Sequence, residues 1–93
     1  MGELILEIVT PNEKYGGLSC DSVHLTVSDG ADGKGGGSYG IRKGHVKSLI
    51  SLDKGKITAY LSGEKVLEAQ CSQGFATVEK NTVTVITESF WEV

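Results

Sequence analysis

Short runs of alternating apolar and polar residues fill most of the chain. The alternation is clearest in 19–27 and 56–61, where apolar side chains recur at every second position, and 82–87 is rich in the β-formers valine, isoleucine and threonine. A period of two residues is typical of a β-strand with one buried face. No segment combines the length and the 3.6-residue period of a full helix, so the pattern predicts an all-β protein.

Turn-forming residues separate these runs at the spacing of about 8 to 12 residues that is typical of β-sandwiches and small barrels. The expected strands are 3–9, 19–27, 46–52, 56–61, 64–71, 74–78 and 82–87, and the expected breaks are 11–12, 16–17, 28–45, 53–55, 62–63 and 79–81. Residues 46–52 also have apolar positions at helical spacing, but their serines and the turn after them favour a strand. We therefore expect a single domain, 1–93, folded as a two-layer β-sandwich or flattened barrel of about eight to ten short, mostly antiparallel strands.

The stretch 28–45 stands apart because it holds more than half of the chain's 13 glycines. Glycine tolerates positive φ and adds no side chain to a core, so we expect a surface loop, where a scaffold often carries its working residues. His45 ends this loop and has Ser38, Ser48 and Asp53 nearby in sequence, but no signature of a nucleophile with its base. The spacing of the glycines around Lys34 does not match a phosphate-binding loop, and the spacing of Asp29 and Asp32 does not match a calcium loop. We expect no catalysis, no metal and no other cofactor.

Charge and composition narrow the possible partners. The formal net charge is -3, from 12 acidic and 9 basic residues scattered singly, which argues against nucleic acid. No apolar run approaches the ~20 residues needed to cross a bilayer, and the N-terminus lacks signal-peptide features, so we expect a cytosolic protein without membrane insertion. Cys20 and Cys71 are interpreted as small buried apolar residues, with a disulfide as the alternative. His24, between apolar alternates, is expected on the solvent face.

Four segments, in order along the chain, are similar to motifs of one family. LEIVTPNEKYGG at 6–17 resembles the pattern LxIVTPexxxfsG, and DSVHLTVSDG at 21–30 resembles the following strand and glycine turn. GIRKGHVKSL at 40–49 matches GxxPGHxPLL at Gly40, Gly44, His45 and Leu49, and GFATVEKNTVTVITE at 74–88 matches GGfxeVxxnxVtVLad. The chain thus resembles the N-terminal β-sandwich domain of the epsilon subunit of the F-type ATP synthase.

Three features depart from that family's pattern. Lys43 replaces a proline, and Lys47 and Ser48 replace an apolar pair, so this motif is more charged than usual. The stretch 31–39 holds nine residues where the family commonly has about two, and flexible surface loops lengthen at small entropic cost. The sequence also lacks the C-terminal helical hairpin of many relatives, so self-inhibition and ATP sensing are not expected of it.

The resemblance implies a non-catalytic rotor subunit of the central stalk. In the family this domain binds the gamma subunit along one side and rests its lower loops on the c-ring, which helps to couple proton transport to ATP synthesis. The resemblance implies c-ring contacts for His45 and Gly44, and also for Asp29 and the inserted Asp32. It further implies a peripheral position on the cytoplasmic face of the inner (plasma) membrane, within a bacterial-type complex.

The alternative is a stand-alone β-sandwich binding module that uses the glycine-rich loop. Such a module would carry exposed aromatic residues clustered on one face, where they stack on a ligand. The aromatic residues of this chain are instead dispersed in sequence, at Tyr15, Tyr39, Tyr60, Phe75, Phe90 and Trp91, and the last two are expected to seal one edge of the core.

Overall fold

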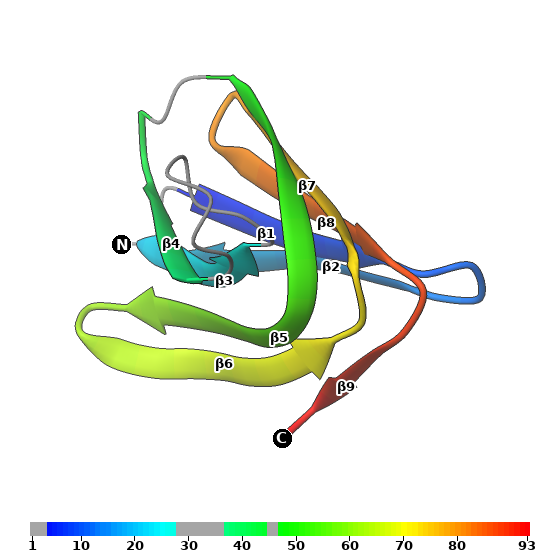
Figure 1. The fold of residues 1–93 in the computed structure, drawn as a ribbon. Coiled ribbons are helices and arrows are strands. Elements are labelled where there is room, and N and C mark those ends of the chain that lie inside the picture. The colour runs from blue at the N-terminus through cyan, green and yellow to red at the C-terminus, as the bar shows by residue number, and fades with distance from the viewer. Residues whose placement is uncertain (1–3, 28–36, 45–46) are drawn as a thin grey trace.

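The computed structural model describes residues 4–27, 37–44 and 47–93. Within these ranges the chain forms nine strands and no helix, which confirms the predicted all-β fold (Figure 1). The strands are β1 (Leu4–Val9), β2 (Lys14–Cys20), β3 (Ser22–Val27), β4 (Gly37–Arg42), β5 (Ser48–Leu61), β6 (Glu64–Cys71), β7 (Gly74–Glu79), β8 (Thr82–Thr87) and β9 (Phe90–Glu92). None of the described residues belongs to a helix long and apolar enough to span a membrane.

The long strand β5 belongs to both layers of the sandwich. Its first part, residues 48–52, pairs with β7, and that layer continues through β8, β1 and β2. Its second part, residues 55–61, pairs with β3 on one side and β6 on the other. Strands β4 and β9 extend this second layer. In Figure 1, β5 is the long curved green ribbon that joins the two layers. Among the described strand pairs only β1 with β8 is parallel.

A bulge bends β5 where the sequence predicts a turn at 53–55. That prediction is wrong, because β5 runs unbroken through these residues. Opposite residues 53–56 of β5, strand β3 has only Thr26, and such an excess of residues on one strand makes it bend. A Cβ atom at Gly55 would lie 2.6 Å from Oγ1 of Thr26, so glycine lets the two strands approach closely here.

Three other predicted boundaries also differ from the structure. Gly16 and Gly17 lie inside β2, at a shift in the β1–β2 register, and Gly17 has a φ of 77°. The strand expected over 19–27 is divided at Asp21 into the end of β2 and the whole of β3. The stretch 28–45, expected to be one loop, contains β4, whose six residues all pair with β3. A strand tolerates glycine where a bulge or a close backbone approach takes the place of side-chain packing.

The two tight turns expected at 62–63 and within 79–81 are confirmed. Ser62 and Gly63 have φ angles of 53° and 81°, and Lys80 and Asn81 have 52° and 63°. Positive φ at both central residues is characteristic of the type I′ turn, whose twist matches that of the strands it joins. Both hairpins, β5–β6 and β7–β8, are therefore set by local sequence.

The core lies between the two layers and consists of alternate residues from the strands. His24 is half-buried and lies outside this core. Phe90 packs against the core from its edge, as expected, whereas Trp91 is exposed. The buried apolar residues are Leu4, Leu6, Ile8, Cys20, Val23, Leu25, Ile41, Leu52, Ile57, Ala59, Leu67, Ala69, Cys71, Ala76, Val78, Val83 and Val85.

The two cysteines are buried and free, which confirms their interpretation as small apolar residues. Burial raises the pKa of both thiols, and the nearby Asp21 carboxylate raises that of Cys20 further. At pH 8 we expect both thiols to react with a disulfide reagent about a hundredfold more slowly in the native protein than in urea, because burial excludes the reagent and also disfavours the reactive thiolate. Fast labelling of the native protein would contradict this.

The same pKa shifts predict the direction of a pH effect on stability. A thiol with a raised folded-state pKa loses its proton first in the unfolded chain. Its stabilising contribution is therefore complete below the unfolded pKa of about 8.5 and is lost as the pH rises through the folded value. The urea midpoint should fall between pH 7 and pH 9.5, and it should fall less in a variant carrying Cys20→Ala and Cys71→Ala.

Candidate docking surfaces

An apolar row crosses the outer face of the layer formed by β5, β7, β8 and β1. Phe75 of β7 lies opposite Ser51 of β5 and Ile86 of β8, and Ile86 also lies opposite Val9 of β1. Phe75 and Ile86 remain 50% and 42% exposed. A groove of about 620 Å³ is lined by all four residues. We refer to Val9, Ile86 and Phe75 as the apolar row, which the polar Ser51 continues onto β5.

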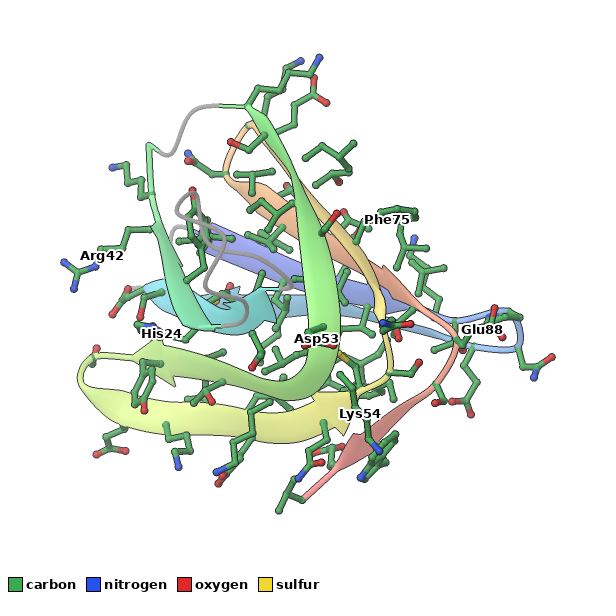
Figure 2. The ribbon with its side chains drawn as sticks, viewed as in Figure 1. His24, Arg42, Asp53, Lys54, Phe75 and Glu88 are labelled. Atoms are coloured by element: carbon green, nitrogen blue, oxygen red, sulfur yellow. The ribbon has the colours of Figure 1, made fainter. Side chains whose placement is uncertain are left out.

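The alternation of β7 and β8 explains why the apolar row faces outward. Ala76 and Val85, the sequence neighbours of Phe75 and Ile86, are fully buried in the core, so the residues beside them point the other way. Figure 2 shows Phe75 on the outer side of β7. Leu49 of β5, 73% exposed, adds apolar surface on the same layer. Exposed apolar side chains gathered in this way are typical of a surface that a partner covers.

The outer face of the second layer carries charged groups instead. Lys56 of β5 and Lys65 of β6 each place Nζ 3.1 Å from a carboxylate oxygen of Glu68. Hydrogen bonds from Lys65 and Lys56 hold the pKa of Glu68 below its ordinary value. A solvated network of this kind contributes little to stability but keeps a surface in water. In the described part of the chain, the second layer also exposes Val66 and Trp91, whereas the apolar row of the first layer lines one groove.

Of the residues predicted to contact the c-ring, Gly44 is described by the structure. It has a φ of 83° in the turn after β4, and its N–H donates to Oδ1 of Asn81 at 2.9 Å. Nearby, Nζ of Lys47 lies 3.7 Å from Oε2 of Glu79. These contacts place the Gly44 turn beside the β7–β8 hairpin at one end of the sandwich, the upper end in Figure 1.

His45, Asp29 and Asp32, the other predicted c-ring contacts, lie outside the described residues. The two aspartates belong to the segment that joins the end of β3 to the start of β4, whereas His45 follows the end of β4. The two groups are therefore attached at opposite ends of a six-residue strand. Their grouping in one contact surface stays a prediction.

The apolar row was not expected from the alternation of single strands. A signal for it is nevertheless present, because 74–78 and 82–87 place apolar residues on both faces, as strands covered on both sides do. Pairing then decides whether these side chains cluster, and pairing is not visible in the sequence. Among the described residues no group of His, Cys, Asp and Glu is arranged to hold a metal ion.

Two cryo-EM structures contain chains with this fold. One is the mitochondrial ATP synthase of Euglena gracilis, whose structure includes the c-ring, with a TM-score of 0.77 and 19% identity over 99% of this chain and 54% of that chain. The other is the central stalk and c-ring of the Tetrahymena thermophila mitochondrial ATP synthase, with a TM-score of 0.71 and 14% identity over 97% of this chain and 66% of that chain. At such identities the likeness shows a shared fold.

Sequence relatives and a family model add to this likeness. The ATP synthase epsilon chain of Lawsonia intracellularis is 35% identical over 86 residues, and that of Desulfatibacillum aliphaticivorans is 32% identical over 88 residues. The alignments cover 92% and 95% of this chain but only 59% and 57% of those relatives. The model of the beta-sandwich domain of the ATP synthase delta/epsilon chain matches residues 3–93. The chain therefore belongs to the ATP synthase delta/epsilon family, and the match confirms the resemblance to the N-terminal domain of the epsilon subunit.

Proposed function

We propose that the chain is a non-catalytic subunit of the central stalk of an F-type ATP synthase. It docks on the gamma subunit and on the c-ring, and so helps to couple proton transport to ATP synthesis. Membership in the delta/epsilon family supports this role, as does the occurrence of the fold in central-stalk and c-ring assemblies. The complex holds the domain peripherally, on the cytoplasmic face of a bacterial inner membrane.

The single observation that carries the docking proposal is the apolar row and the groove of about 620 Å³ that it lines. An interface core is depleted of charge and enriched in aromatic and large aliphatic side chains. Phe75, Ile86 and Leu49 provide such a surface on the layer of β5, β7 and β8. The network around Glu68 gives the other layer a surface suited to water. We assign the gamma subunit to the apolar row.

The c-ring is assigned to the end of the sandwich that carries Gly44 and His45. The hydrogen bond between Gly44 and Asn81 links this turn to the β7–β8 hairpin, so the end is supported by two elements. The proposal keeps Asp29 and Asp32 as further c-ring contacts, although the segment that carries them joins β4 at its other end. A rigid sandwich suits a rotor part, because torque passes between partners without being absorbed by internal motion.

Substitution of the apolar row tests the assignment of gamma. Exchanging both Phe75 and Ile86 for serine should weaken binding to the purified gamma subunit of the same organism by about thirtyfold or more, the loss expected of buried interface anchors. Affinity can be measured by isothermal titration calorimetry, with circular dichroism to verify folding.

Val66→Ser is the matched control, because Val66 is an exposed apolar residue of β6 in the other layer. It should leave the affinity for gamma unchanged. Failure of the unmodified chain to bind gamma would reject the proposed function. Unchanged binding of the double serine variant would reject only the choice of face.

A further inference from the structure

A second concave surface lies on the outer face of β4, β3 and the second part of β5, in the layer that does not carry the apolar row. It is a hollow of about 380 Å³ lined by Asp21, Ser22, His24, Arg42, Tyr60 and Gly63. In Figure 2, Arg42 reaches outward from β4 on the same side of the molecule as His24. Neither the family match nor the proposed docking surfaces account for this group of side chains.

Strand register brings three hydrogen-bond donors into one row. Ser22 of β3 lies opposite Arg42 of β4 on one side and Tyr60 of β5 on the other. Paired strands lie about 4.8 Å apart, so the backbone positions of these three residues lie within roughly 10 Å of each other. The row is fixed by pairing between strands, which makes it more rigid than a set of donors on a loop.

The next row adds His24 to the lining of the hollow. His24 of β3 lies opposite Gly40 of β4, and a Cβ atom at Gly40 would lie 3.2 Å from Cε1 of the imidazole. The absence of a side chain at Gly40 thus lets the ring lie over the strand. The Tyr60 ring meets the imidazole edge-on, with centroids 5.5 Å apart and planes at 90°. These two contacts position the His24 ring in the lining of the hollow.

Two groups of opposite charge, Arg42 and Asp21, line the hollow, and they differ in how they are engaged. Arg42 is exposed, and no ion pair engages its guanidinium among the described residues. The nearby carboxylate of Asp21 accepts a hydrogen bond from the N–H of Ser62 at 2.6 Å, so one of its oxygens is already engaged. Arg42 therefore supplies a positive charge that the described structure leaves available to a ligand.

We propose that this hollow binds an oxyanion, either a phosphate or a carboxylate group. The Arg42 guanidinium makes the paired hydrogen bonds that planar carboxylates and phosphates accept. The hydroxyl groups of Ser22 and Tyr60 donate to the oxygens that remain. The imidazole of His24 adds a ring N–H to the site. The inference does not depend on the role in the central stalk, because it concerns the chain alone.

Titration of the isotope-labelled full chain tests the proposal. Amide signals are followed by NMR as sodium phosphate or sodium acetate is added at constant ionic strength, with sodium chloride as the reference. We expect saturable shifts at Ser22, His24 and Arg42. Saturation by phosphate alone identifies a phosphate site, and saturation by acetate alone identifies a carboxylate site. Shifts no larger than those with chloride overturn the proposal.

Three variants connect the shifts to the proposed geometry. Arg42→Gln should weaken the binding of the ion by about tenfold or more, because a charge-assisted pair is lost. Lys54→Gln, which removes an exposed cation outside the hollow, should leave the affinity for the ion unchanged. Asp21→Asn keeps an oxygen for the Ser62 N–H and should tighten binding, because it removes the negative charge. Equal binding by the Arg42 and Lys54 variants would overturn the assignment.

Discussion

Replacement of Gly74 by alanine is expected to lower the free energy of unfolding by about 3 kcal/mol or more, at the upper end of the cost of overpacking. Gly74 begins β7 and lies opposite Thr87 of β8. A Cβ atom there would collide with the carbonyl oxygen of Ile86 and would lie 3.0 Å from both the carbonyl carbon of Ile86 and Cα of Thr87. All of these atoms belong to backbone, so no side-chain rotation relieves the collision. Since a domain of this size is stable by roughly 5 to 10 kcal/mol, the change removes a large part of the total.

Gly16→Ala is the matched control for this substitution. Gly16 also lies in a strand, β2, but the nearest neighbours of a Cβ atom there are Cε of Lys14 at 3.8 Å and Cγ of Glu7 at 3.9 Å, which is ordinary contact. Its replacement should change the stability by less than about 0.5 kcal/mol, or raise it slightly by restricting the unfolded chain. Urea unfolding followed by circular dichroism measures both variants. Equal stability of the two would show that β7 and β8 separate easily at this point.

Thr87→Val is expected to cost about 1 to 3 kcal/mol, although the side chain keeps its shape. Thr87 is buried at the end of β8, and its hydroxyl donates to the carbonyl oxygen of Ser72 at 2.9 Å. The hydroxyl of Ser72 lies 2.9 Å from that of Thr87 and accepts from the N–H of Ser89 at 3.1 Å. Removal of one oxygen therefore breaks a chain of hydrogen bonds that joins the β6–β7 and β8–β9 connections.

Two variants separate the hydroxyl from the rest of the Thr87 side chain. Thr87→Ser keeps the oxygen and loses a methyl group, so it should be less harmful than Thr87→Val. Thr84→Val makes the same chemical change at a half-buried position of β8 and should alter the stability by less than about 0.5 kcal/mol. Thermal unfolding of the three variants gives the comparison. A stability of Thr87→Val equal to that of the unmodified chain would show that the network contributes nothing.

The strands and tight turns of this protein were largely predictable because local chemistry sets them. Alternation at 56–61 predicts Ile57, Ala59 and Leu61 inward, and the structure buries Ile57 and Ala59 in the core and leaves Leu61 half-buried. The turn at 62–63 and the turn within 79–81 join neighbouring strands, so their geometry depends on few residues. These features require no knowledge of which distant strands pair.

The path of β5 was not predictable, because the same residues fit two structures. Asp53, Lys54 and Gly55 are typical of a turn, yet here they form the bulge that carries one strand from the first layer into the second. The decisive contact is between Gly55 and Thr26, which are distant in sequence. Similarly, the glycines of 37–42 suggested a loop, whereas pairing with β3 makes this segment a strand.

The candidate sites also differ in whether the sequence could predict them. The resemblance supplied Gly44, which the structure places in a turn held by Asn81, and it supplied His45, Asp29 and Asp32, which lie outside the described residues. The apolar row and the hollow near Arg42 each combine residues from three or more strands. A surface of that kind exists only once the register is known.

The parallel pairing of β1 with β8 has a consequence for how the protein is made. A ribosome releases β1 long before β8, so the first hairpin, β1–β2, must wait with one edge unpaired and with Leu4, Leu6 and Ile8 uncovered. Contacts between strands so distant in sequence also slow folding, to milliseconds or longer in comparable β-proteins. During synthesis this edge leaves the nascent chain open to aggregation and to capture by a chaperone.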